Sequence, residues 1–204
     1  MNVRLRYSVT FPAGVWFEEQ LLMGNYTLTM SMTTQTLDPL DQNIALDRIK
    51  YFLLNEMHST VFVSQAESEQ AEAFAQLGMN VTTLPQEPVD QIVSIALYYK
   101  LNAIVEGRMK ITELMFCSDT GDNIEYFHNE NEHTDLFPAG GWWHQAGLTH
   151  SDIVFDEEDS EQAQPTAEEE WQEQELSWNQ AQPTSDIAQV VFANFDQYQN
   201  ETKH

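Results

Sequence analysis

Residues 2–11 alternate between polar and apolar side chains without interruption, and no other feature constrains the fold of this chain as strongly. A period of two places successive side chains on opposite faces, so the segment is predicted to be a half-buried β-strand. We expect Pro12-Ala13-Gly14 to end it, and Gly24-Asn25 to turn the chain into a second strand over residues 26–33. The two segments predict an antiparallel pair. Their apolar faces consist of Val3, Leu5, Tyr7, Val9 and Phe11 in the first strand and of Tyr26, Leu28, Met30 and Met32 in the second.

The middle of the chain alternates between helical and strand patterns that are joined by short connections. Asp38-Pro39 is typical of a helix N-cap followed by the first helical residue, and Gly78 and Gly107 are typical helix ends. The predicted elements are a helix to residue 53, a strand at 60–63, a helix at 64–78, a strand at 81–84, a helix at 88–107 and closing strands at 110–116 and 124–128. The order ββαβαβαββ predicts an α+β (mixed α/β) fold with helices packed on a mixed sheet, formed by residues 1–155.

Charge is distributed very unevenly along the chain. The sequence holds 33 acidic and 8 basic residues, which gives a net charge of −25, and most of the excess lies after residue 110. This charge repels phosphate backbones and anionic lipids, so direct binding to nucleic acid or to a membrane is not expected. A single cysteine, Cys117, excludes an intrachain disulfide framework, and the N-terminus lacks the apolar run of a signal peptide. We therefore expect a cytoplasmic protein.

The C-terminal part of the chain is acidic and of low complexity. Residues 156–184 contain a pentapeptide, QAQPT, that occurs at 162–166 and again at 180–184. This composition predicts a disordered linker, and residues 185–204 then predict an amphipathic helix and a tail. Trp171, Leu176 and Trp178 are the predicted anchors for a protein partner that offers a basic or apolar groove.

Two adjacent tryptophans, Trp142 and Trp143, follow a pair of glycines. Neighbouring side chains of an extended segment point in opposite directions, so at least one of the two is expected at the surface or at a pocket. Exposed tryptophans favour a contact site for a partner. The alternative is that both pack over the edge of the sheet, and the sequence supports both interpretations equally.

Four of the six histidines, His128, His133, His144 and His150, lie between residues 128 and 152. Carboxylate residues are interspersed with them. Imidazole and carboxylate groups are ligands for zinc, iron or manganese, so these residues are a candidate site for a divalent metal. The sequence suggests no other cofactor. Their spacing matches no compact metal motif, and scattered histidines in a solvated loop are the alternative. The sequence contains neither a glycine-rich dinucleotide loop nor a P-loop.

The segments "QNIALDRIKYFLLNEMHSTVFV", "VTTLPQEPVDQIVSIALYYKLNAIVEGRMKITE" and "SDTGDNIEYFHNENE" resemble an uncharacterised conserved hypothetical protein family of marine T-even-like tailed bacteriophages. The resemblance covers residues 42–132 and not the acidic extension. It implies a viral protein expressed in the cytoplasm of a bacterial host. The family has no assigned activity, so the resemblance supplies no site residues.

These observations favour a non-enzymatic accessory protein that binds a protein partner. One alternative is a metal-binding module or a metal-dependent hydrolase that uses the histidines of residues 128–152. Another is a DNA mimic that inhibits a host DNA-binding enzyme through its negative charge. The mimic needs carboxylates in a regular array on a rigid surface, and a disordered tail does not provide that array. The oligomeric state is left open.

Overall fold

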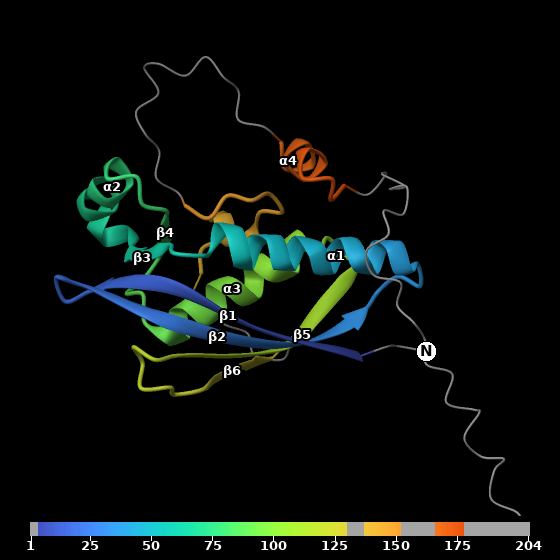
Figure 1. Ribbon diagram of the computed structural model, residues 1–204, viewed down its shortest axis with the longest axis horizontal. Coiled ribbons are helices and arrows are strands. Elements are labelled where there is room, and N and C mark those ends of the chain that lie inside the picture. Colours follow the sequence, from blue (N-terminus) through green and yellow to red (C-terminus); the bar gives the residue numbers. More distant parts are fainter. Residues whose placement is uncertain (1–3, 130–136, 152–165, 178–204) are drawn as a thin grey trace, which may run out of the picture.

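The computed structural model describes residues 4–129, 137–151 and 166–177 (Figure 1). The predicted order of strands and helices is confirmed, and the fold is a mixed α+β fold. In chain order the elements are β1 (Arg4–Phe17), β2 (Gln20–Thr34), α1 (Pro39–Tyr51), a π-helical turn (Phe52–Glu56), β3 (Val61–Ser64), α2 (Ser68–Gln76), β4 (Val81–Leu84), α3 (Asp90–Ile104), β5 (Met109–Ser118), β6 (Tyr126–Asn129), a 3₁₀ turn (Trp142–His144) and α4 (Ala167–Glu173). No helix within the described ranges is long and apolar enough to cross a membrane.

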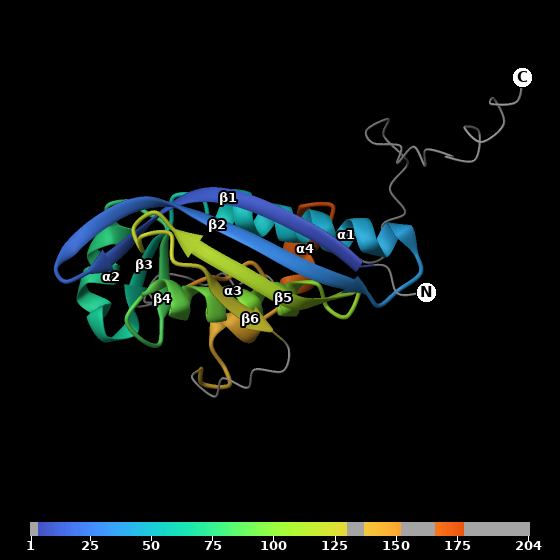
Figure 2. The ribbon, with the colours of Figure 1, turned by 90° about the horizontal axis from the view of Figure 1, so that it is seen from below.

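The strands form one six-stranded sheet in the order β4-β3-β1-β2-β5-β6. The pairs β1–β2, β2–β5 and β5–β6 are antiparallel, whereas β1–β3 and β3–β4 are parallel. The sheet is therefore mixed, as expected from strand pairs at both ends of the order and βα units between them. Figure 2 shows that β1 and β2 are much longer than β3 and β4.

The β1–β2 hairpin is longer than predicted, and its turn lies elsewhere. The strand does not end at Pro12; β1 continues to Phe17, and the turn is made by Glu18 and Glu19, whose φ angles are 49° and 60°. Proline is tolerated here because its missing N–H falls on the side of β1 that faces away from β2. Gly24 lies inside β2, where a Cβ atom would come within 2.2 Å of the Asp119 carboxylate. Gly24 is therefore needed for close packing against Asp119 and is not the turn residue that the sequence suggests.

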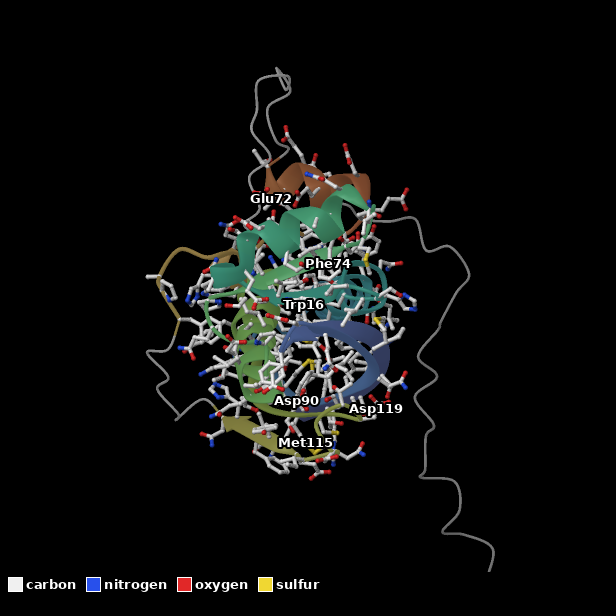
Figure 3. All side chains as sticks on the ribbon, turned by 90° about the vertical axis from the view of Figure 1, so that its left-hand side faces the viewer. Trp16, Glu72, Phe74, Asp90, Met115 and Asp119 are labelled. Atoms are coloured by element: carbon white, nitrogen blue, oxygen red, sulfur yellow. The ribbon has the colours of Figure 1, made fainter. Side chains whose placement is uncertain are left out.

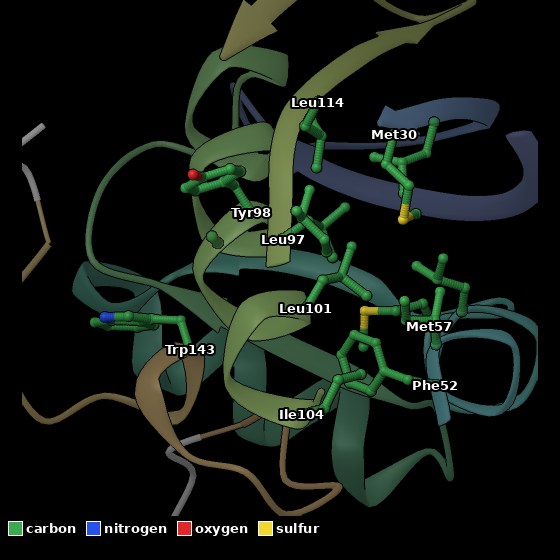
Figure 4. Close-up of a cluster of buried hydrophobic side chains, with 14 of the residues drawn as sticks. Met30, Phe52, Met57, Leu97, Tyr98, Leu101, Ile104, Leu114 and Trp143 are labelled. Carbon is green, nitrogen blue, oxygen red and sulfur yellow. The ribbon is translucent and has the colours of Figure 1, made fainter. Parts of the chain in front are cut away.

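Helices α1 and α3 cover one face of the sheet (Figure 1) and bury the predicted apolar side of β2, whereas on β1 Phe11 is buried and the apolar residues from Leu5 to Val9 are partly buried. Figure 4 shows part of this core, with Leu97 and Leu101 of α3 beside Met30 and Met57. Helix α2 packs on the opposite face, but only at the end formed by β3 and β4, where Phe74 meets Trp16 with the ring centroids 5.5 Å apart (Figure 3). Among the described residues, no helix covers the rest of that face, which we call the open face.

Two buried cations attach the C-terminal segments to the helices. The three N–H groups of the Lys100 ammonium, on α3, are shared among four backbone carbonyls, those of Trp142, Gln145, Gly147 and Thr149. Arg48 of α1 donates through Nε to the Leu176 carbonyl at 2.9 Å, and its guanidinium lies 4.5 Å from the centre of the Trp171 ring. The segment that contains α4 therefore belongs to the folded body.

The linker predicted over residues 156–184 is accordingly wrong for residues 166–177. Thr166 and Glu169 form a capping box, in which the Thr166 hydroxyl accepts from the Glu169 N–H and the Glu169 carboxylate accepts from the Thr166 N–H. The cap fixes the start of α4, and Trp171 buries its ring completely. The second QAQPT copy and the helix predicted at 185–204 lie outside the described residues.

Candidate functional site

The open face carries a groove of about 570 Å³ at the end of the sheet that α2 leaves uncovered. It is lined by Arg4, Leu5, Arg6, Thr29, Ser31, Glu113, Leu114, Met115, Phe127, His128 and Asn129. The strand register explains this grouping. Arg6 pairs with Ser31, Ser31 pairs with Glu113, and Glu113 pairs with Asn129, so one row of outward side chains crosses four strands.

The neighbouring rows of the open face add a positive corner and an apolar wall. Arg4 pairs with Thr33, and Thr33 pairs with Lys110, so all three lie on the same side of the sheet. Met115 pairs with Phe127, an edge-strand residue that is 67 % exposed. The groove thus places cationic and apolar groups side by side, which is a composition typical of protein interfaces.

The positive corner contrasts with the charge of the chain. Seven of the eight basic residues fall within the described ranges, and Arg48, Lys100 and Arg108 among them are buried. Of the four that are exposed, only Lys50 lies away from the open face; the others are Arg4, Arg6 and Lys110. Glu113 forms an ion pair with Arg4, and the hydrogen bond from Arg4 lowers the pKa of the Glu113 carboxyl. Among the described residues, Glu113 is the carboxylate that faces Arg4 and Arg6, so the two guanidinium groups give this corner a positive charge that attracts anionic groups.

The two adjacent tryptophans are not exposed, and their prediction as partner-binding residues is wrong. Trp142 and Trp143 are 0 % and 1 % exposed. Trp142 Nε1 donates to the Thr83 carbonyl at 2.7 Å, and Trp143 Nε1 donates to the Pro138 carbonyl at 3.2 Å. The segment forms a 3₁₀ turn, in which successive side chains are about 120° apart rather than opposed, so both rings enter the same core. Figure 4 shows Trp143 beside α3.

The predicted anchors of the acidic extension are separated by the fold. Trp171 is completely buried and donates through Nε1 to the Ala146 carbonyl at 3.2 Å, so its prediction as an exposed anchor is wrong. Leu176 is partly buried against the main core. Trp178 lies outside the described residues, and its role as an anchor stays a prediction.

The predicted metal ligands do not form a cluster within the described ranges. His128 and His144 both lie beside the ring of Tyr99, at centroid distances of 6.4 and 4.9 Å. His150 instead lies 3.8 Å from the Glu56 carboxylate at the end of the π-helical turn. His133 lies outside the described residues. Among the residues that the structure describes, no group of three or more histidine, cysteine, aspartate or glutamate side chains is arranged to hold a metal ion.

A second polar cluster joins α3 to the β5–β6 hairpin. The Asp90 carboxylate, at the first turn of α3, accepts hydrogen bonds from the Ser118 N–H and hydroxyl at 3.0 and 2.7 Å. The Ser118 hydroxyl in turn accepts from the Gly121 N–H at 2.9 Å. Burial raises the pKa of the Asp90 carboxyl. Ser118 is 1 % exposed, so the cluster holds the hairpin in place and offers no accessible nucleophile.

His150 makes the stability of the fold dependent on pH. Burial lowers the pKa of His150 to about 4 from an ordinary value of 6.5. Between these values the unfolded chain binds a proton that the folded chain does not, so acidification favours unfolding. We expect the free energy of unfolding to fall by about 3 kcal/mol through this residue as the pH drops from 6.5 to 4. Urea unfolding of the wild type and of His150→Gln at several pH values checks this.

The comparison between the two proteins isolates the histidine. Burial raises the pKa values of Glu56 and Asp90, and these groups stabilise the fold on acidification, which is the opposite direction. Asp90 lies outside the contact between His150 and Glu56, so its contribution largely cancels in the difference. Equal pH dependence in the two proteins would contradict the assignment to His150.

Sequence reasoning missed the groove, although its signal was present. The polar faces of the first two strands follow directly from the alternation, and Arg4 and Arg6 share one of them. The convergence of Lys110, Met115 and Phe127 on that face depends on the pairing of β2 with β5 and of β5 with β6. The sequence alone does not predict that pairing.

The sequence matches no protein-family model and no curated protein. Among solved structures, the fold is similar to an uncharacterized protein from Wolinella succinogenes, with a TM-score of 0.48, 8 % identity, and coverage of 64 % of this chain and 99 % of that one. It is also similar to two catalytic-residue mutants of Plasmodium vivax 6-pyruvoyltetrahydropterin synthase. Both have a TM-score of 0.40 and cover 63 % of this chain and 99 % of theirs, at 7 % and 8 % identity. Similarity at this level carries no argument about activity.

Proposed function

We propose that this chain is a phage-encoded accessory protein that binds a protein partner, and that the open-face groove is its binding surface. The observation that carries the proposal is that Arg4 and Arg6 line the groove, with Lys110 in the neighbouring row of the same face, in a chain with a net charge of −25. Exposed cations are scarce among the described residues, and three of four share this surface. The phage origin rests on the sequence resemblance alone.

The chemistry of the groove supports a partner with acidic and apolar side chains. Phe127 and Met115 provide apolar contact area, and aromatic residues and arginine are enriched where binding energy is concentrated. The cations increase the rate of encounter with an acidic surface and disfavour a basic one. The proposal therefore adds a contact region on the sheet that is distinct from the acidic extension.

A capture experiment with two matched variants tests the proposal. Phe127→Ser removes an apolar side chain that is 67 % exposed and is expected to weaken partner binding by about tenfold. Leu77→Ser is the control, because Leu77 is 77 % exposed at the end of α2, away from the groove. Proteins captured from a bacterial lysate by the wild type would be identified, purified and titrated against all three forms.

The result depends on the purified pair and not on the lysate. Weaker binding by Phe127→Ser with unchanged binding by Leu77→Ser supports the groove as the binding surface. Equal affinity of a purified partner for the wild type and Phe127→Ser would overturn it.

A further inference from the structure

One long edge of the sheet has no neighbouring strand among the described residues. Strand β1 pairs with β2 along its whole length, but it pairs with β3 only at Gly14 and Val15. Residues 4–11 therefore border β2 on one side only. Figure 2 shows this part of β1 along the margin of the sheet.

Backbone hydrogen bonds identify which groups the edge presents. The Pro12 carbonyl accepts from the Ser59 N–H at 2.7 Å, and the Gly14 N–H donates to the Thr60 carbonyl at 2.8 Å. Even-numbered residues of β1 thus direct their backbone groups away from β2. By the period of a strand, the N–H and C=O groups of the preceding even residues point to the same side. These residues are Arg4, Arg6, Ser8 and Thr10, and no backbone partner for them occurs within the described ranges.

Side-chain burial gives independent evidence that this edge is accessible. On the helix-covered face, Leu5, Tyr7 and Val9 are only partly buried. Their direct partners on β2 are fully buried: Met32, Met30 and Leu28. Among residues 4–129, 137–151 and 166–177, the core layer therefore extends to β1 and is not closed beyond it. An added strand would cover the exposed parts of the three β1 side chains.

The edge is suited to strand addition, and its charge selects the strand. Residues 4–11 contain no proline or glycine, and β1 pairs with β2 without a bulge in this region. Natural proteins protect an open edge with prolines, bulges or charged side chains. Of these three, residues 4–11 have only the charged side chains, those of Arg4 and Arg6. Arg4 and Arg6 repel a basic strand and attract an acidic one. A second copy of this chain is disfavoured by its net charge of −25.

We propose that the partner contributes an extended acidic segment that adds to the sheet as a strand along Arg4–Thr10. This deepens the proposed function and rests on it. Carboxylates at alternate positions of the added strand face Arg4 and Arg6 on the open face. The intervening apolar side chains of the added strand pack beside Leu5, Tyr7 and Val9. The backbone of the added strand forms hydrogen bonds with the N–H and C=O groups that the even-numbered residues of β1 direct away from β2.

A synthetic peptide provides the probe. It has about eight residues, which matches a typical strand, and it alternates valine with glutamate; a second peptide has lysine in place of glutamate. Binding is measured by fluorescence anisotropy, and amide exchange by NMR. The glutamate peptide is expected to bind at least about tenfold more tightly than the lysine peptide and to slow exchange at Arg4, Arg6, Ser8 and Thr10.

Variants of the edge separate strand addition from attraction by charge. Ser8→Pro removes an edge N–H and keeps the hydrogen bonds with β2, so it is expected to lower the affinity for the glutamate peptide by about tenfold. Ser8→Ala keeps the N–H and should bind the peptide as tightly as the wild type does. The double variant Arg4→Glu, Arg6→Glu changes two exposed side chains and introduces no proline. It is expected to abolish the preference for the glutamate peptide over the lysine peptide. Circular dichroism confirms that each variant is folded.

The outcomes are distinct. Absence of binding by the glutamate peptide, no slowing of edge amides, or equal binding by folded Ser8→Pro and Ser8→Ala overturns strand addition. Dimerisation of the wild type that Ser8→Pro prevents would assign the edge to a second copy and also overturn the proposal. If a purified partner loses affinity with Phe127→Ser but not with Ser8→Pro, strand addition fails while the proposed binding function stands.

Discussion

Replacing Lys100 with methionine is expected to lower the free energy of unfolding by about 3–5 kcal/mol, since a buried carbonyl left without its donor costs about 1–3 kcal/mol. The Lys100 ammonium is fully buried and lies 2.6–3.2 Å from four backbone carbonyl oxygens, which share its three N–H hydrogens. It also lies 5.6 Å from the centre of the Phe52 ring and 5.8 Å from that of Trp142. Methionine fills a similar volume but has no hydrogen to donate.

Lys50→Met is the matched control for this change. Lys50 lies on α1 and forms an exposed ion pair with Asp47 at 3.0 Å, so its loss is expected to cost less than about 1 kcal/mol. Urea unfolding monitored by tryptophan fluorescence measures both variants, because Trp142 and Trp143 lie in the segment that Lys100 holds. If Lys100→Met costs no more than Lys50→Met, the hydrogen bonds from Lys100 do not hold residues 142–149 in place.

Local sequence patterns predicted the elements well but not the limits of the hairpin. The alternation of residues 2–11 and the caps at Asp38, Gly78 and Gly107 depend on near neighbours, and the strand is confirmed from residue 4 onward, as are the three caps. Pro12 was expected to end the first strand because proline lacks an N–H. Whether that loss matters depends on which side of the strand bonds a neighbour, and this follows from the register with β2 and β3.

The tryptophans show a different limit of sequence reasoning. Their burial depends on partners far away along the chain: Trp142 bonds the Thr83 carbonyl, and Trp171 stacks on Arg48. Acidic composition suggested a linker around Trp171 because composition ignores such contacts. The capping pattern from Thr166 to Glu169 was nevertheless present in the sequence and indicates a helix start. Weighing that local signal above composition would have placed α4 correctly.

The binding surface was the least predictable feature. Arg4 and Arg6 lie on a polar face that the alternation defines, yet a polar face alone is normal for a sheet that is half exposed. The groove arises because β5 and β6 add Glu113, Met115 and Phe127 to the same face. The edge of β1 has no neighbouring strand in the described part of the chain because β3 is short and pairs only with Gly14 and Val15. Neither the partner of a strand nor the length of the pairing is encoded by local periodicity.

Replacing Trp171 with alanine is expected to destabilise the fold by about 3–5 kcal/mol, the usual cost of truncating a large buried aromatic side chain. The ring is fully buried, bonds the Ala146 carbonyl and covers the Arg48 guanidinium. Trp171→Phe, which keeps a ring beside Arg48 but loses the N–H, should cost less. Urea unfolding of the three proteins measures the order.

Truncations give the same prediction at the level of the chain. A protein that ends at Ser177 retains α4 and the Leu176 carbonyl that Arg48 bonds, so it should unfold at a urea concentration close to that of the full chain. A protein that ends at residue 165 loses both and should resemble Trp171→Ala or be less stable. Equal stability of the two truncated proteins would show that α4 contributes nothing to the body. The distinction decides how binding is tested, because a deletion that begins before Thr166 would reduce capture of a partner by weakening the fold that carries the groove.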